Sequence, residues 1–455
     1  MLRLVLPAMA AFALTSCDGQ VATSYEPQPY VEFENAEWTR DAVIYQMNTR
    51  QFTKEGTFSA AQEHLPRLAE MGVDIVWLMP IHPIGEVNRK GGMGSPYSVL
   101  DYRAVNPDLG TAEEFRAFVD KAHDLGLKVI LDWVANHSAW DNPLIEEHPE
   151  WYLRTPEGDP MPPEGTDWSD VIDFDYSQPG LREYMTGSLA YWVREFDVDG
   201  YRADVAGYVP TDFWETARKE LNAIKPVFML AEWETRDLHR TAFDATYGWG
   251  WKEAMQELVA DGSGAGAMRG YFAAQNTTWP RAAYRMNYTD NHDQNSWDGV
   301  ASRIYGQAYQ TAMALSFVSP GIPLIYNGQE ADLDRQLSFF EKDEIEWREG
   351  RYDAFLRELI ALKTQERALW NGRYGAPVVD VPNSANADIL SFVRGEGADR
   401  IFAVFNLSPR AHEVTFDLAR HHGNYSDAIS DEPVAFDGDT QLTLGPWDFR
   451  ILRAD

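Results

Sequence analysis

Cysteine is almost absent from the sequence. Cys17 is the only one among 455 residues, so no disulfide can form within the chain, and no Cys/His spacing typical of a metal site is present. The sequence also has no internal repeat and no low-complexity tract. After the N-terminus, no segment reaches the roughly eighteen uncharged apolar residues of a membrane span. We therefore expect a globular, soluble body.

Positive charge is scarce as well. Lysine and arginine number 39 against 71 acidic residues, which gives a formal net charge of -32. A surface of this charge repels a phosphate backbone, so we expect no nucleic acid partner, and a neutral substrate is favoured. Hydrophobic residues make up 44% and aromatic residues 13% of the chain, enough for a packed core. The length fits a large barrel with a smaller companion domain.

The N-terminus has the pattern of an export signal. It reads MLRLVLPAMAAFALTSCDGQ, with one arginine, an apolar run over 4–14 and then small residues. We expect residues 1–16 to be a signal peptide, and LTSC resembles a bacterial lipobox in which Cys17 is lipidated. Residues 17–37 then form a lipidated tether. This predicts an exported, membrane-anchored lipoprotein facing the periplasm or cell exterior of a bacterium; a cleaved signal with an incidental cysteine is the alternative.

Short apolar runs recur along the chain, and most are followed by an amphipathic stretch. The segments 59–72 and 111–126 carry apolar residues at helical spacing and end at glycine. Eight strands, most with a helix after them, are what a (β/α)8 TIM barrel of the α/β class requires. The predicted strands are AVIY (42–45), DIVWLMP (74–80), LKVILDW (127–133), VDGYRAD (198–204), VFMLAEW (227–233), AFDATY (242–247), YRMNY (284–288) and IPLIY (322–326).

Two regions depart from this alternation. Residues from about 135 to 179 are rich in Pro, Trp, Asp and Glu and have no helical period, which predicts an inserted subdomain after the third strand, at the active face of the barrel. Over 376–455, short alternating strands broken by Gly, Pro and Asn predict a C-terminal antiparallel β-sandwich. The catalytic barrel then spans residues 38–375.

Four candidate strands end in acids, namely Asp132 in LDWVANH, Asp204 in GYRAD, Glu232 in LAEWE and Asp293 in NYTDNHD. Catalytic groups of a TIM barrel lie at the C-terminal ends of its strands. A single acid there is more often a helix cap or turn former, but four at one rim repel one another and are hard to explain structurally. The pattern predicts a carboxylate active site. Two rival carboxylates stand beside these acids, Glu234 and Asp290.

The same segments, in this order, resemble the four conserved regions of the α-amylase family, glycoside hydrolase family 13. DWVANH is similar to the first region, GYRADVAGY to the second, AEWE to the third and YTDNHD to the fourth. DVIDFDY (170–176) resembles the motif of the inserted domain, and SPYSVLDY (95–102) the segment that supplies a sugar-stacking tyrosine. The resemblance runs from about residue 41 to the C-terminus.

This resemblance implies a retaining glycoside hydrolase, an α-amylase that cleaves α-1,4-glucosidic bonds of starch-like glucans or maltooligosaccharides through a covalent glycosyl-enzyme intermediate. Asp204 would be the nucleophile, Glu232 the general acid/base and Asp293 the transition-state stabiliser. Such chemistry needs two carboxyls about 5 to 5.5 Å apart. Arg202, on the same strand face as Asp204, is predicted to keep that carboxylate ionised. The apolar setting of Glu232 is predicted to raise its pKa.

Further residues are expected to bind substrate. The resemblance implies that His137 and His292 hydrogen-bond the sugar as neutral imidazoles and that Tyr97 stacks on it. Arg202 and Asp132 belong to the same set, Asp132 as a structural member rather than a proton carrier. For the histidines and Tyr97, ordinary core packing is the alternative.

The sequence also departs from the family pattern. Many members have Lys and His three and four positions after the nucleophile, where this chain has Gly207 and Tyr208, so specificity on the leaving-group side is open. Asn136 matches the family's usual calcium ligand. Whether calcium binds stays open; the acids that could complete its site are Asp167, Asp170 and Asp173.

Several activities share this machinery. An α-glucosidase, a cyclomaltodextrinase or a transglycosylase of the same family would differ only in the shape of the site. From a different class, a non-catalytic glucan-binding lipoprotein is the alternative, because a fold does not guarantee activity. No organic cofactor is expected.

Overall fold

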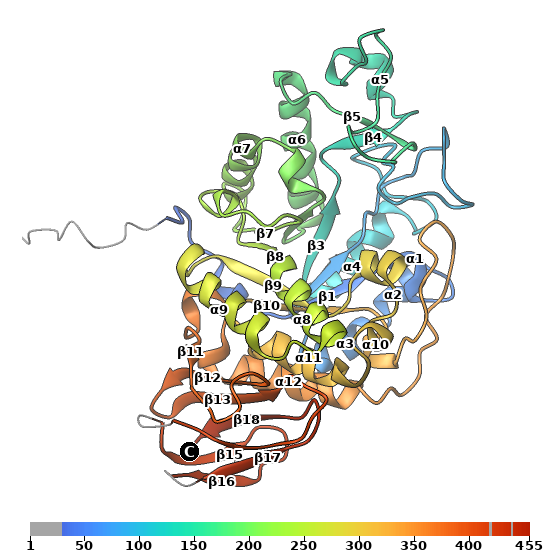
Figure 1. Cartoon of the computed structure of the whole chain (residues 1–455). Helices are drawn as coiled ribbons and strands as arrows, with labels where there is room; N and C mark the ends of the chain where they lie inside the picture. Colours follow the sequence, from blue (N-terminus) through green and yellow to red (C-terminus); the bar gives the residue numbers. More distant parts are fainter. Residues whose placement is uncertain (1–29, 418–420, 438–439) are drawn as a thin grey trace, which may run out of the picture.

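The computed structural model describes residues 30–417, 421–437 and 440–455. A closed barrel of parallel strands lies at its centre, in the order β1-β10-β9-β8-β7-β6-β3-β2 (Figure 1). All eight predicted strands are confirmed. Their bounds are β1 Ile44–Met47, β2 Ile75–Leu78, β3 Lys128–Trp133, β6 Gly200–Ala203, β7 Phe228–Ala231, β8 Ala245–Tyr247, β9 Tyr284–Tyr288 and β10 Ile322–Tyr326.

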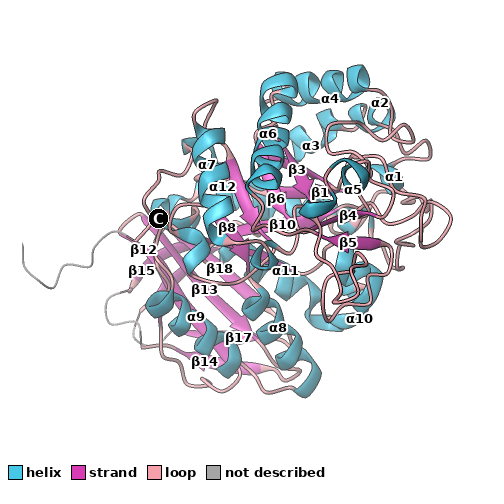
Figure 2. Ribbon diagram, turned by 90° about the horizontal axis from the view of Figure 1, so that it is seen from above, coloured by secondary structure: helices cyan, strands magenta, loops and turns pink. Residues whose placement is uncertain are grey.

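The barrel strands are apolar on both faces because side chains fill the barrel and helices cover it from outside. In β3, Ile130 belongs to the interior cluster, together with Trp77 of β2. The alternate residues Val129 and Leu131 belong to the cluster that packs against the helices. Seen from above, helices surround the strands (Figure 2). The polar strand ends are thereby left at the rim.

The larger helices follow the strands. The predicted helix over 111–126 is α4, which begins with a capping box between Thr111 and Glu114. The predicted helical segment 59–72 forms two shorter helices, and Pro66 lies in the first turn of the second, where a missing N–H is tolerated. The helices outside the inserted segment are α1 Thr49–Phe52, α2 Phe58–Gln62, α3 Leu65–Met71, α4 Ala112–Asp124, α6 Pro179–Phe196, α7 Thr211–Asn222, α8 Trp249–Asp261, α9 Gly266–Thr278, α10 Ala301–Ile304, α11 Tyr309–Val318 and α12 Asp353–Gln365.

The predicted insertion after the third barrel strand is present. It contains β4 His137–Ala139, α5 Leu144–Glu147 and β5 Val171–Asp173, and β4 pairs with β5 in antiparallel fashion. The Tyr102 hydroxyl donates to the His137 carbonyl at 2.6 Å and fastens the insertion to the barrel. The inserted segment and the C-terminal sheets lie at opposite ends of the molecule in Figure 1.

The C-terminal region is antiparallel, as predicted, but its two layers are unequal. Among the residues of this region that the structure describes, one layer has six strands, in the order β11-β12-β13-β18-β15-β16, and the other has two, β14 and β17. Val404 and Phe436 of the large sheet belong to one buried apolar cluster with Val414 and Leu444 of the small one. The bounds are β11 Val379–Asp380, β12 Ile389–Glu396, β13 Asp399–Asn406, β14 His412–Thr415, β15 Gly423–Asp427, β16 Pro433–Phe436, β17 Gln441–Leu444 and β18 Phe449–Ala454.

Within the described ranges, none of the helices has the length and apolar character needed to cross a bilayer. Cys17 and the predicted signal peptide and lipobox lie outside the described residues.

Candidate active site

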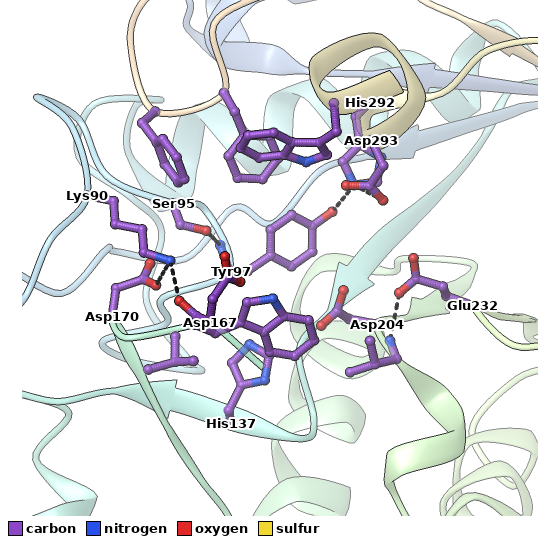
Figure 3. A pocket seen from close by; sticks show the side chains of 16 residues that line it. Lys90, Ser95, Tyr97, His137, Asp167, Asp170, Asp204, Glu232, His292 and Asp293 are labelled. Carbon is purple, nitrogen blue, oxygen red and sulfur yellow. Dashed lines mark hydrogen bonds and ion pairs between the residues drawn. The ribbon is translucent and has the colours of Figure 1, made fainter. Parts of the chain in front are cut away.

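A cavity of about 480 Å³ opens at the carboxyl ends of the barrel strands. Three of the predicted acids line it: Asp204 after β6, Glu232 after β7, and Asp293 after β9 (Figure 3). The two rival carboxylates do not line it. Asp290 is buried and accepts a bond from the Asn291 N–H, and Glu234 accepts one from the Gly250 N–H.

A single buried guanidinium holds the carboxyls together. Nη1 of Arg202 lies 2.7 Å from Asp132 and 2.9 Å from Asp204, and its Nη2 lies 2.9 Å from Glu232. The first two contacts are hydrogen bonds, whereas the Glu232 contact lacks hydrogen-bond geometry, since Nη2 has no bonding partner. Arg202 is fully buried. One cation thus partly neutralises three acids that would otherwise repel one another.

Asp132 and Arg202 lie beneath the cavity and are not among its lining residues. Asp132 accepts bonds from Trp77 Nε1 at 3.2 Å and from the Tyr97 hydroxyl at 3.0 Å. Asp132 and Arg202 were both predicted to bind substrate. In the structure, the Asp132 side chain at the end of β3 and the Arg202 side chain of β6 contact each other rather than the cavity, and they support the groups that face it.

Burial dominates the protonation of the two central carboxyls. Burial raises the pKa of Glu232 to about 8, although the Arg202 cation opposes the shift. Burial likewise raises the pKa of Asp204 to about 7, and Arg202 again opposes the shift. The expected rise for Glu232 is thus present, but the expectation that Arg202 suffices to keep Asp204 ionised was too simple. Glu232 holds its proton to higher pH than Asp204, which is the order that an acid beside a nucleophile requires.

Asp293 is more exposed than the other two carboxyls, with 41% of its side chain accessible against 10% for Asp204 and 13% for Glu232. Its Oδ2 lies 3.3 Å from Nε2 of His292, and it precedes a single π-helical turn, Gln294–Asp298, a feature often found at functional sites. An exposed carboxylate here places negative charge opposite Asp204 and Glu232 across the cavity (Figure 3).

The predicted sugar-binding histidines and tyrosine all line the cavity. Burial lowers the pKa of His137 to about 3 and that of His292 to about 4, so both imidazoles are neutral near pH 7. The Tyr97 hydroxyl lies 2.7 Å from Nε2 of His292, and the Tyr97 and His292 rings are stacked 5.6 Å apart. Neutral imidazoles and a fixed phenol suit an uncharged, hydroxyl-rich ligand.

Gly207, one of the two departures from the family pattern, lets a tryptophan approach the nucleophile's loop. A Cβ at Gly207 would lie 2.1 Å from Cε2 of Trp233. Tyr208 stays 49% exposed, with its ring 5.5 Å from Trp233 and 6.4 Å from Trp168. Because Trp233 directly follows Glu232, this aromatic group lies on the acid's side of the cavity.

Sequence reasoning missed the opposite side of the cavity. Trp297, Phe339, Phe340 and Lys90 line it, and Trp297 is 57% exposed. Trp297 lies in the π-helical turn Gln294–Asp298, and the other three come from loops with no motif of their own. The sequence signal that could have pointed to this side is the pair of adjacent phenylalanines, Phe339 and Phe340, in the loop after the last barrel strand.

Of the predicted calcium donors, only Asn136 and Asp173 are brought together. Asn136 interacts with Asp173, whose pKa burial raises to about 6 and whose Oδ1 has no hydrogen-bond partner. Asp170, however, is paired with Lys90 at 3.1 Å, and Asp167 offers Lys90 only its carbonyl. Among the residues with described positions, no group of three or more His, Cys, Asp or Glu could hold a metal ion. The predicted side-chain set therefore does not fit calcium, which takes six to eight oxygens.

A closed (β/α)8 barrel with three carboxyls around a buried arginine at its carboxyl rim defines an enzyme of the glycoside hydrolase type. The chain belongs to the α-amylase family, glycoside hydrolase family 13: residues 32–261 match the family model described as alpha amylase, catalytic domain. Residues 380–451 match the maltogenic amylase C-terminal domain.

Solved structures agree with this assignment. The noncanonic maltogenic alpha-amylase AmyB from Thermotoga neapolitana is 31% identical, with a TM-score of 0.83 over 91% of this chain and 99% of that one. An alpha-amylase from Lactobacillus plantarum is 32% identical, with a TM-score of 0.82 over 92% and 100%.

Among curated relatives, Alpha-amylase MalA of Haloarcula japonica is 27% identical over 90% of this chain. This chain spans only 61% of that relative's length, and 62% of the length of a maltosyltransferase from Salinibacter ruber, which is 28% identical over 84% of this chain.

Proposed function

We propose that the protein hydrolyses α-1,4-glucosidic bonds of starch-like glucans or maltooligosaccharides with retention of configuration. The observation that carries this proposal is the pair Asp204 and Glu232, each 2.9 Å from a different nitrogen of the Arg202 guanidinium. Neighbouring nitrogens of one guanidinium hold the two carboxyls close together. This favours the short separation of retaining enzymes over the wider spacing that leaves room for a water.

In the first step, protonated Glu232 gives its proton to the glycosidic oxygen while the Asp204 carboxylate attacks the anomeric carbon. The leaving sugar departs with the proton, and a glycosyl ester forms on Asp204. Glu232 then takes a proton from water, whose oxygen attacks the same carbon and releases Asp204. Asp293, opposite them, stabilises positive charge on the sugar ring.

The remaining lining residues orient the sugar. Asn136 Nδ2 lies 3.3 Å from Nδ1 of neutral His137, which leaves the His137 Nε2–H free to donate to a sugar hydroxyl. The single N–H of neutral His292 instead donates to the Tyr97 hydroxyl oxygen, which it holds in position. Asp132 fixes the Tyr97 hydroxyl, so the ring stays in place beside the sugar. These groups hold the anomeric carbon in line with Asp204.

The substrate class is supported by the relatives. Similar proteins include an intracellular maltogenic amylase of Bacillus subtilis, 25% identical over 93% of this chain, and a cyclomaltodextrinase of a Bacillus species, 25% identical over 87%. Transfer to a second sugar instead of water is the alternative within this function, favoured by the exposed Tyr208 ring beside Trp233 and Trp168.

The test is the cleavage of maltoheptaose by three purified variants. Asp204→Ala and Glu232→Gln should each lower kcat by several orders of magnitude without unfolding the protein. Glu234→Gln, which alters a neighbouring carboxyl outside the cavity, should retain most activity. Proton NMR of the first product should show the α-anomer. Near-normal turnover in Asp204→Ala, or a β-anomeric product, would overturn the assignment.

We also propose that the enzyme is exported and anchored to the membrane by lipid on Cys17. The lipobox-like LTSC after an apolar run supports this. Expression in a bacterial host with labelled palmitate should label the wild type but not Cys17→Ser, and only the wild type should sediment with membranes. Equal labelling of both would disprove lipidation at Cys17.

A further inference from the structure

The loop 85–94, between β2 and Tyr97, spans the two sides of the active-site cavity. At its start, the Glu86 N–H donates to Asp141 of the inserted segment at 2.8 Å. At its end, the Met93 N–H donates to the Phe340 carbonyl at 3.0 Å, and the Gly92 N–H donates to Glu341 at 2.6 Å. The loop therefore connects the inserted segment to the loop after β10.

The close packing of the loop 85–94 against Phe340 depends on a glycine. Gly91 has a φ of 66°, and a Cβ there would lie 2.5 Å from the Phe340 Cβ. Only glycine adopts this conformation at such a distance without strain. The loop 85–94 is thus seated directly against the aromatic side of the cavity, with no space for a sugar between them.

Lys90 completes the connection on the other side. Its Nζ lies 3.1 Å from Oδ1 of Asp170 and donates to the Asp167 carbonyl at 3.1 Å, and all three residues line the cavity. The Asp170 side chain is only 6% exposed, and that of Lys90 29%. A partly buried ammonium with two acceptors is held in place, because releasing it would leave Asp170 buried without a cation.

The two ends of the cavity differ chemically. Glu232 lies at one end and Lys90 at the other, with Tyr97 between them (Figure 3). Glu232 protonates the leaving oxygen, so the leaving part of the substrate extends past Glu232 and Trp233. Glucose units on the non-reducing side of the broken bond must then extend toward Lys90.

We propose that the loop 85–94, fastened by Lys90, closes this end of the cavity and makes the enzyme act from the non-reducing end of a chain, releasing glucose or maltose. The inference rests on the proposed function and specifies its substrate end. With this end closed, only one or two sugars lie beyond the bond, because Lys90 and Asp170 line the cavity just past Tyr97 (Figure 3). A chain that continues in that direction would have to displace the loop.

The experiment uses maltoheptaose labelled at its reducing end, with the first products separated by length. In the wild type, the label should remain on chains of five and six units, and unlabelled glucose or maltose should appear. In Lys90→Ala, the share of labelled chains of four units or fewer should rise about fivefold or more. Asp170→Asn, which removes the partner rather than the lysine, should shift the products in the same direction.

Lys225→Ala is the matched control, because the Lys225 ammonium is also partly buried and held by two oxygen acceptors. Its Nζ lies 2.6 Å from Asp197 and 3.0 Å from Asp199, and none of these three residues lines the cavity. This variant should leave the product lengths unchanged. If the wild type produces labelled chains of every length from the start, the closed end is disproved while the proposed hydrolysis stands. Failure of the wild type to cleave maltoheptaose would instead disprove the proposed function.

Discussion

Replacing Arg202 with methionine tests the central feature of the site. Methionine fills similar space but removes the cation that contacts Asp132, Asp204 and Glu232. Breaking a buried ion pair costs about 3 to 5 kcal/mol when the remaining charge stays buried and unpaired. Because Asp204 and Glu232 can take up protons instead, we expect the free energy of unfolding in urea to fall by no more than about that amount near pH 7. The loss should shrink at low pH, where the three carboxyls are protonated.

Activity should change in a way that stability alone does not explain. Arg202 lowers the pKa of both Asp204 and Glu232, so without it both carboxyls hold their protons to higher pH. An opposite charge at this distance typically shifts a carboxyl by about 1 to 3 pH units. The acidic limb of the kcat/KM profile should therefore move to higher pH by about one unit or more, and activity at pH 7 should fall at least tenfold.

Arg218→Met is the matched control. Arg218 is also buried, and its Nη1 lies 2.6 Å from Asp244, but neither residue lines the cavity. This variant should lose stability and keep the wild-type pH profile. If Arg202→Met had an unshifted profile, or activity within about twofold of the wild type, the guanidinium would not set the protonation of Asp204 and Glu232.

Three further predictions concern protonation, packing and calcium. The wild-type kcat/KM should rise as Asp204 ionises near pH 7 and fall as Glu232 ionises near pH 8. Folding raises both pKa values from their ordinary range, so these two groups should make the fold less stable as pH rises from about 4 to 8. Urea unfolding at several pH values measures this loss of stability. Gly207→Ala should displace the Trp233 ring, visible as altered tryptophan fluorescence, and cost about 1 to 3 kcal/mol; unchanged fluorescence would contradict the close contact. Excess EDTA should leave Tm and activity unchanged, because Asp170, a predicted calcium ligand, is already paired with Lys90. A fall in Tm or activity that added calcium reverses would show that Asn136 and Asp173 recruit further ligands.

The barrel was predictable because its strands are short apolar runs buried on both faces, such as KVILDW in β3. In the C-terminal region, β15 has no such apolar run. β15 reads GNYSD and buries only Tyr425 and Asp427, so its position depends on pairing with β16 and β18 rather than on its own composition.

The acids of the site could be predicted because each one follows the end of a barrel strand. Asp204, Glu232 and Asp293 each follow a barrel strand, and a closed barrel must bring those ends together. The contact between Lys90 and Asp170 joins two loops without periodicity. Nothing in the sequence near either residue specifies the other, because the contact depends on how the insertion packs on the barrel.

Closure of the barrel also governs when the enzyme can become active during synthesis. β1 pairs with β2 early in the chain, but its other edge pairs with β10, where Ile44 lies opposite Leu324. Until β10 has been made, the partial sheet has two unpaired edges, which can associate with other chains. The cavity also needs Phe339 and Phe340, which come after β10. A nascent or truncated chain that ends before this point should therefore be inactive and prone to aggregate.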